Sequence, residues 1–132
     1  MNYLLDTHTF LWAAFSPNKL STKARNEIRS AENQVCISLV SFWEISLKYS
    51  LGKIELANCT PADMPDIATQ MGFEIIQLGA QDTASFYQLP KVAHKDPFDR
   101  MIIWQAIQQQ WVLISKDSNF SEYRQFGLKV LW

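Results

Sequence analysis

The sequence predicts an α/β fold, a three-layer α/β/α sandwich in which helices cover a central, largely parallel sheet of four to five strands. Short continuous apolar runs, typical of buried strands, alternate along the chain with longer segments of helical periodicity. This alternation is typical of domains built around a parallel sheet. The 132 residues are 48% hydrophobic and 19% charged, and they contain no repeat or linker, so we expect one globular domain over residues 1–132.

The first quarter of the chain contains two predicted strands and two predicted helices. A buried strand over Tyr3–Leu5 precedes an apolar helix over Thr9–Phe15, which ends at a Ser-Pro-Asn turn. Ser21 is placed to cap a surface helix over Thr22–Ala31, whose apolar residues have helical spacing. A second buried strand covers Val35–Ile37.

An apolar stripe predicts the next helix, over Leu39–Leu51, which Gly52 ends. The stripe consists of residues at intervals of three and four, namely Val40, Trp43, Leu47 and Leu51. Glu44 lies one position past it. Most of the tryptophans in such apolar segments are expected to pack in the core, namely Trp12, Trp43, Trp104 and Trp111.

The rest of the chain repeats the alternation of helices and strands. The predicted elements, in order, are a helix over 60–71, a strand over 73–76, helices over 80–89 and 99–109, a strand over 112–114 and an edge strand over 129–131. The first of these helices has a capping Thr60 before a first-turn proline, and a glycine follows its end.

Composition excludes several classes of protein. The net charge of −1, from 12 basic and 13 acidic residues, argues against a nonspecific nucleic-acid coat but leaves a nuclease open, since bound cations can attract phosphate. Cys36 and Cys59 form no disulfide framework or zinc pattern, which favours a reducing cytoplasm. We expect no signal peptide and no membrane association, because no apolar run approaches the length of a membrane helix.

Four carboxylates fall where the elements of such a fold converge. Asp6 directly follows the first strand, and Asp117 lies three residues beyond the strand over 112–114. Glu44 lies on the helix after the second strand, and Asp99 begins the helix that leads into the strand over 112–114. The carboxyl ends of parallel strands share one edge of a sheet, so we expect these side chains to meet there. Like charges held together repel, and one or two Mg²⁺ or Mn²⁺ ions would compensate them.

Each carboxylate also has a simpler interpretation. Asp6, Asp99 or Asp117 could cap a helix or a turn, and Glu44 could be a surface partner of Lys48. Two other functions also stay open. One is a metal-dependent phosphatase of similar layout, although Asp6 is not followed by the second Asp of haloacid-dehalogenase-like enzymes, and the other is a noncatalytic RNA- or protein-binding module.

Four sequence blocks together resemble VapC-type PIN domains. They are Tyr-Leu-Leu-Asp-Thr-His at 3–8, Ser-x-x-Ser-x-Trp-Glu-Ile-x-x-Lys at 38–48, His-Lys-Asp-Pro-Phe-Asp-Arg at 94–100 and Ile-Ser-Lys-Asp-x-x-Phe at 114–120. The resemblance covers nearly the whole chain. It implies a PIN-like fold and a Mg²⁺- or Mn²⁺-dependent endoribonuclease that is the toxin of a toxin-antitoxin pair.

The resemblance also implies roles for individual residues. Asp6, Glu44, Asp99 and Asp117 would be the catalytic acidic quartet that binds metal. Asp96 would be either a further ligand or, as we favour, the N-cap of the following helix. Residues expected to touch RNA or to orient the carboxylates are Thr7, Lys48, His94, Arg100 and Ser115.

The resemblance further implies two protein partners, a second copy of the chain in a homodimer and a small antitoxin that covers the active-site groove. The first predicted helix contains more apolar side chains than a single core can bury, and the excess could form a surface that binds either partner. Its residues are Phe10, Leu11, Trp12 and Phe15.

Overall fold

A five-stranded sheet, parallel throughout, forms the centre of the computed structural model, which describes residues 1–132. The strand order is β3-β2-β1-β4-β5. The strands are β1 (Asn2–Leu5), β2 (Gln34–Ser38), β3 (Glu74–Ile76), β4 (Val112–Ile114) and β5 (Lys129–Leu131). The α/β class and the parallel sheet predicted from the sequence are confirmed, and the sequence 129–131 does form an edge strand.

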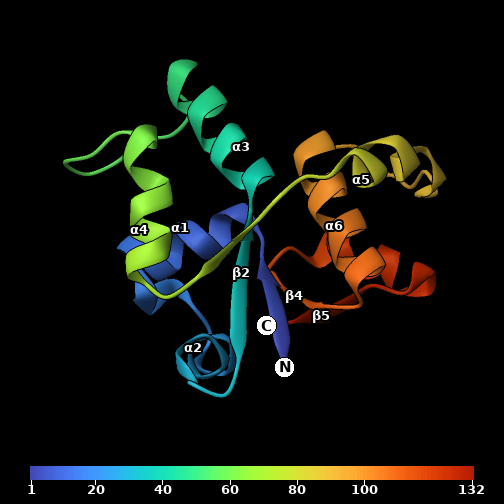
Figure 1. Ribbon diagram of the computed structural model, residues 1–132, viewed down its shortest axis with the longest axis horizontal. Helices are drawn as coiled ribbons and strands as arrows, with labels where there is room; N and C mark the ends of the chain where they lie inside the picture. Colours follow the sequence, from blue (N-terminus) through green and yellow to red (C-terminus); the bar gives the residue numbers. More distant parts are fainter.

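Helices cover the sheet on both faces, with α1, α2 and α4 on one side and α5 and α6 on the other (Figure 1). The α-helices are α1 (Thr7–Phe15), α2 (Thr22–Arg29), α3 (Leu39–Ser50), α4 (Met64–Gln70), α5 (Ala80–Ser85) and α6 (Pro97–Gln109). The 3₁₀ segments are η1 (Pro17–Lys19), η2 (Pro61–Asp63), η3 (Phe86–Gln88) and η4 (Ser118–Phe126). None of these helices is long and apolar enough to cross a lipid bilayer.

Alternation along the strands produces two hydrophobic cores. In β1, Tyr3 and Leu5 face the core beneath α1, α2 and α4, whereas Leu4 faces the core beneath α6. Successive side chains of a strand point to opposite faces, so a strand buried on both faces must be apolar throughout. The continuous apolar runs in the sequence therefore mark the middle layer of a sandwich.

The helix boundaries differ from the predicted ones at both starts and ends. α2 ends at Arg29, two residues before the predicted end, and the predicted helix over 80–89 is divided into α5 and η3. α1 begins at Thr7 and α6 at Pro97, because Asp6 and Asp96 cap them directly. The predicted helix over 60–71 is divided into η2 and α4, since Pro65 has no amide proton with which to continue the first turn. The nine-residue η4, of which the sequence suggested only a short turn after Asp117, is largely unpredicted.

Most of the predicted apolar stripe of α3 faces outward, and only Val40 of the stripe is buried. This orientation contradicts the expectation that Trp43 packs in the core. Trp43 is 63% exposed and Leu51 is 60% exposed, and the Trp43 ring packs edge-on against Phe98 at the start of α6. The buried face of α3 consists of Val40, Ser41, Glu44 and Ile45. Half of that face is polar because it borders the functional site described below. Of the other tryptophans, Trp104 is buried, whereas Trp12 and Trp111 are half-buried.

Phe10 of α1 is central to one of the two cores. Its ring is fully buried and packs edge-to-face against Phe42 at 6.0 Å and Phe73 at 6.3 Å between ring centroids. We expect Phe10→Ala to lower the free energy of unfolding by about 3–5 kcal/mol, measured by urea denaturation, because it removes buried area and leaves a cavity. Phe15→Ala, at a position 37% exposed, is the control, with an expected loss of less than about 1 kcal/mol. Equal losses in the two variants would contradict this description of the core.

Candidate metal centre

The predicted carboxylates meet in one cleft at the carboxyl edge of the sheet. The strand order reverses between β1 and β4, and Asp6 follows the first of these strands while Asp117 follows the second. Crevices at such a reversal are the usual ligand sites of parallel α/β sheets. The cleft has a volume of about 300 Å³ and is lined by Asp6, His8, Trp12, Glu44, Lys48, Asp96, Asp99, Lys116 and Asp117. We call it the carboxylate cleft.

Asp6 is held rigidly at the floor of the carboxylate cleft. It is 5% exposed, and its Oδ1 accepts a hydrogen bond from the Thr9 amide at 2.8 Å, which caps α1. Its Oδ2 accepts a hydrogen bond from the Ser115 hydroxyl at 2.6 Å. Burial raises the pKa of Asp6 above its usual value, although these hydrogen bonds oppose the shift. Asp6 is thus both a helix cap and a carboxylate oriented toward the cleft.

Glu44 lies on the buried face of α3 and is 2% exposed. One carboxylate oxygen accepts a hydrogen bond from the Thr7 hydroxyl at 2.5 Å, and the other forms an ion pair with Lys48 one turn along the helix. Burial disfavours the charged form of Lys48, but the hydrogen bond and charge of Glu44 outweigh this effect, and the pKa of Lys48 rises. Lys48 is therefore a cation inside the cleft.

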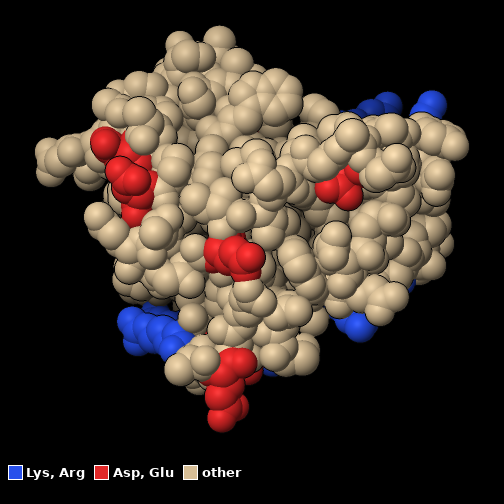
Figure 2. All heavy atoms as spheres, viewed as in Figure 1, with Lys and Arg blue, Asp and Glu red and all other residues tan.

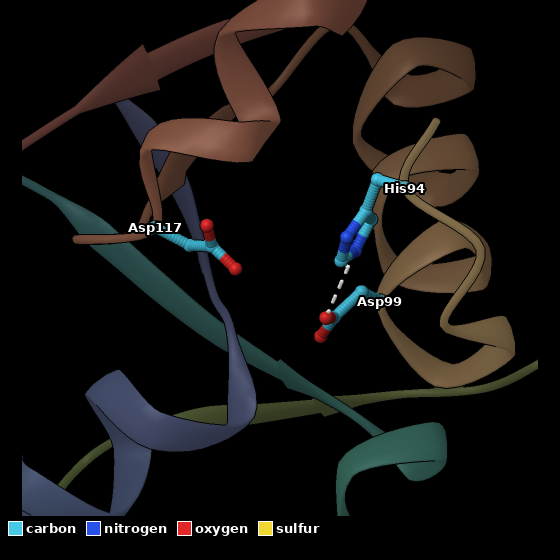
Figure 3. Close-up of side chains that lie close together, drawn as sticks. All are labelled: His94, Asp99 and Asp117. Carbon is cyan, nitrogen blue, oxygen red and sulfur yellow. Dashed lines mark hydrogen bonds and ion pairs between the residues drawn. The ribbon is translucent and has the colours of Figure 1, made fainter. Parts of the chain in front are cut away.

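Asp99 lies in the first turn of α6 and faces two other ionisable side chains (Figure 3). Its Oδ2 is hydrogen-bonded to His94 Nε2 at 3.1 Å, and Asp117 points toward this pair from the loop after β4. Asp96 caps α6 by accepting a hydrogen bond from the Asp99 amide at 3.0 Å, which is the interpretation favoured from the sequence. Asp96 also lines the cleft, so the capping role leaves one oxygen free.

The mutual repulsion of the carboxylates in the cleft acts most strongly on Asp99. Burial and the neighbouring carboxylates, first Asp96 and then Glu44, Asp6 and Asp117, raise the pKa of Asp99 to about 8. A carboxylate kept from ionising by other carboxylates indicates a site in which positive charge is missing. A divalent cation would supply that charge.

Two sets of ligand atoms are close enough together to hold a cation. His94, Asp99 and Asp117 form one set, and Glu44, Asp96 and Asp99 form the other, with all ligand atoms of a set within 4.8 Å of one another. Asp99 belongs to both. Because most of these ligand atoms are carboxylate oxygens, the two sets suit Mg²⁺ or Mn²⁺ better than softer metals. Asp6 belongs to neither set but lines the same cleft.

The other residues singled out in the sequence divide between this cleft and its surroundings. Thr7 and Ser115 hold Glu44 and Asp6 by the hydrogen bonds given above, and Lys48 lies in the cleft. Arg100 instead lines a neighbouring cleft, where His94 is also found.

Three further residues line the carboxylate cleft, namely His8, Trp12 and Lys116, whereas the sequence predicted Trp12 in the core or on an apolar surface instead. The position of each residue in the sequence, close to a predicted carboxylate ligand, could have indicated that it lines the cleft. His8 and Lys116 lie within two residues of Asp6 and Asp117, and Trp12 lies one helical turn beyond His8.

Comparisons with known proteins agree with this arrangement. Residues 3–125 match the family model for the PIN domain. The chain is 26% identical over 129 residues to ribonuclease VapC22 of Mycobacterium tuberculosis (strain ATCC 25618 / H37Rv), covering 98% of this chain and 97% of that protein.

Solved structures share the fold at lower identity. Rickettsia felis VapBC2 bound to a DNA fragment from its promoter superposes with a TM-score of 0.71 at 21% identity, covering 99% of this chain and 98% of the other. DNA-bound VapBC from Salmonella typhimurium gives a TM-score of 0.66 at 18% identity, covering 99% and 97%. The match to the family model spans most of β1, all of β2, β3 and β4, and every carboxylate of the cleft, and the chain belongs to the PIN-domain family.

Proposed function

We propose that this chain is a Mg²⁺- or Mn²⁺-dependent endoribonuclease and the toxin of a toxin-antitoxin pair. The observation that carries the proposal is the convergence of five carboxylates, from elements far apart in sequence, on one cleft. The similarity to a protein named a ribonuclease and to structures of toxin-antitoxin complexes supports the same conclusion.

The proposed ligands are Asp6, Glu44, Asp99 and Asp117, with Asp96 as a further candidate, for one or two ions. When bound, such a cation supplies Lewis-acid chemistry, lowering the pKa of water and offsetting the charge that develops on a phosphodiester. Thr7 and Ser115 keep the oxygens of Glu44 and Asp6 oriented before the metal arrives, so little reorganisation accompanies binding.

Side chains of the cleft would accept the proton of the attacking water and would hold the RNA phosphate in place. In the proposed reaction, water attacks phosphorus in line, and a carboxylate of the cleft accepts the proton of that water. The bond from phosphorus to the leaving ribose oxygen breaks, and this oxygen takes up a proton from solvent water. Lys48 would stabilise negative charge on a non-bridging phosphate oxygen, because its ammonium group already lies among the carboxylates. No covalent protein intermediate is required.

The proposal includes two protein partners, an antitoxin and a second copy of the chain. Exposed apolar side chains on α3 and the groove beside α1 support it, since such surfaces are uncommon on proteins without partners. The groove is lined mainly by apolar side chains, among them Leu11, Trp12, Phe15 and Leu56. Phe10 does not contribute, because its ring is fully buried.

Incubation of the purified chain with structured RNA tests the enzymatic part of the proposal. We expect internal cleavage with Mg²⁺ or Mn²⁺ and no cleavage with EDTA, because the carboxylates alone repel the phosphate. Products are resolved by gel electrophoresis, and restoration of activity by excess metal is the control for damage by the chelator.

Two results would favour the alternatives. Phosphate release from small esters without RNA cleavage would indicate a phosphatase, and RNA binding without cleavage under any metal would indicate a noncatalytic module. Either result would overturn the proposed activity.

A further inference from the structure

A second cleft adjoins the carboxylate cleft and has the opposite charge. It has a volume of about 450 Å³ and is lined by Phe86, Lys91, Val92, His94, Lys95 and Arg100. We call it the basic cleft. It contains three cationic side chains and no carboxylate, in a protein whose net charge is −1.

None of these three cations is neutralised within the chain. The ion pairs of the structure are Lys48 with Glu44 and His94 with Asp99, and neither involves Lys91, Lys95 or Arg100. The guanidinium of Arg100 donates hydrogen bonds to the carbonyls of Leu89 and Pro90 and to the Tyr123 hydroxyl, all of which are uncharged. The cleft therefore retains its positive charge and attracts anions.

Arg100 also fixes the shape of the basic cleft. Its guanidinium lies over the rings of Phe86, at 5.4 Å, and Tyr123, at 5.9 Å from the centroid. The Tyr123 hydroxyl in turn donates a hydrogen bond to the His94 carbonyl at 3.1 Å. The loop that holds both lysines is thus tied to α6 and η4 at several points, so the two exposed ammonium groups extend from a fixed frame.

His94 joins the two clefts. It lines the basic cleft, while its ring nitrogen is hydrogen-bonded to Asp99 in the carboxylate cleft. A polyanion whose phosphate lies among the carboxylates can therefore continue past His94 into a positively charged channel. By contrast, the face shown in Figure 2 displays separate acidic side chains, with Lys and Arg only along its margins.

We propose that the basic cleft binds a phosphate of the RNA strand next to the phosphate that is cleaved, with Lys91 and Lys95 as the contacting side chains. This inference rests on the proposed function. A nucleic-acid strand fits better than an acidic protein segment, because its regularly spaced phosphates let one strand place one phosphate at the cation of the carboxylate cleft and another in the adjoining basic cleft. Arg100 is a positioning residue that also contributes charge.

The double variant Lys91→Ala/Lys95→Ala tests the proposal by steady-state cleavage. We expect the KM for an RNA oligonucleotide to rise roughly tenfold with kcat within about twofold, since both lysines lie away from the reacting phosphate. A dinucleoside monophosphate has a single phosphate and cannot reach the basic cleft, so its slow cleavage should be unchanged. The double variant Lys19→Ala/Lys23→Ala removes the same charge from exposed positions that line neither cleft and is the matched control.

Binding provides a readout that does not depend on catalysis. Anisotropy of a labelled RNA is measured with Mg²⁺ on the Asp6→Asn background, where the strand stays intact. The slope of log Kd against log salt should fall in magnitude by about 0.7 for each phosphate that a lysine no longer neutralises. If the KM, the Kd and the salt slope of Lys91→Ala/Lys95→Ala equal those of the control variant, the basic cleft does not bind RNA phosphate. Cleavage by the unaltered chain would then still establish the nuclease. If the unaltered chain binds RNA through both lysines but does not cleave it, the proposed role of the basic cleft is supported and the proposed endoribonuclease activity is wrong.

Discussion

Asp6→Asn and Asp99→Asn should each lower the rate of RNA cleavage by roughly a thousandfold or more, equivalent to about 4 kcal/mol of transition-state stabilisation. Each replacement keeps the size of the side chain but removes one negative charge from the proposed ligand set. The capping hydrogen bond from Thr9 can still be accepted by an asparagine oxygen at position 6, because Asn is as good a helix cap as Asp. We therefore expect both variants to stay folded while their affinity for Mn²⁺ falls, as measured by calorimetry.

Asp63→Asn is the matched control for these two variants. Asp63 also accepts a capping hydrogen bond, from the Thr60 amide, but it is exposed and lies outside the carboxylate cleft. It should retain full activity and metal affinity. Full cleavage by Asp6→Asn or by Asp99→Asn would remove the basis of the metal-site assignment.

The stability of the metal-free protein should fall as the pH rises from about 4 to about 8. The pKa of Asp99 is about 8 in the folded chain and near its ordinary value of 3.8 in the unfolded chain. Below pH 4 the group is protonated in both states, and between these values only the folded state holds the proton. Stability therefore decreases with pH in this window, by a few kcal/mol in total, and the raised pKa of Asp6 acts in the same direction.

Urea denaturation between pH 5 and pH 8 in EDTA measures this loss. Added Mg²⁺ should abolish most of it, because the cation binds the ionised carboxylates of the folded state. Asp99→Asn should flatten the profile in EDTA and remove most of the effect of Mg²⁺. A flat profile for the unaltered chain in EDTA, or an equally steep one for Asp99→Asn, would contradict this origin of the effect. The pKa of Lys48, raised above 10.5, keeps that group outside the window.

Much of the fold could be predicted from sequence because the strands are buried on both faces. A segment such as Tyr3–Leu5 must be apolar throughout, and this distinguishes it from the amphipathic helices around it. The orientation of α3 could not be predicted in the same way. Its outward face carries the large apolar side chains of Trp43 and Leu47, whereas its buried face contains Ser41 and Glu44, so periodicity alone indicates the wrong side.

The carboxylates of the site were predictable because sequence order fixes which loops reach the carboxyl edge of the sheet. Asp6 and Asp117 follow adjacent strands, and a parallel sheet brings the ends of these strands together. The basic cleft gave no such signal. Lys91 and Lys95 lie in an irregular loop, and its position depends on the hydrogen bonds of Arg100 with Leu89, Pro90 and Tyr123.

The two hydrophobic cores have a consequence for how the protein responds to heat. Asp6 leads into α1, which packs on one core, Asp99 projects from α6, which packs on the other, and α3 contributes Ile45 to the first core and Val40 to the second. The ligand atoms thus keep their spacing only while both outer layers stay docked on the sheet. Detachment of a single layer would disperse the proposed ligands even if the opposite half remained native, so inactivation should precede global melting.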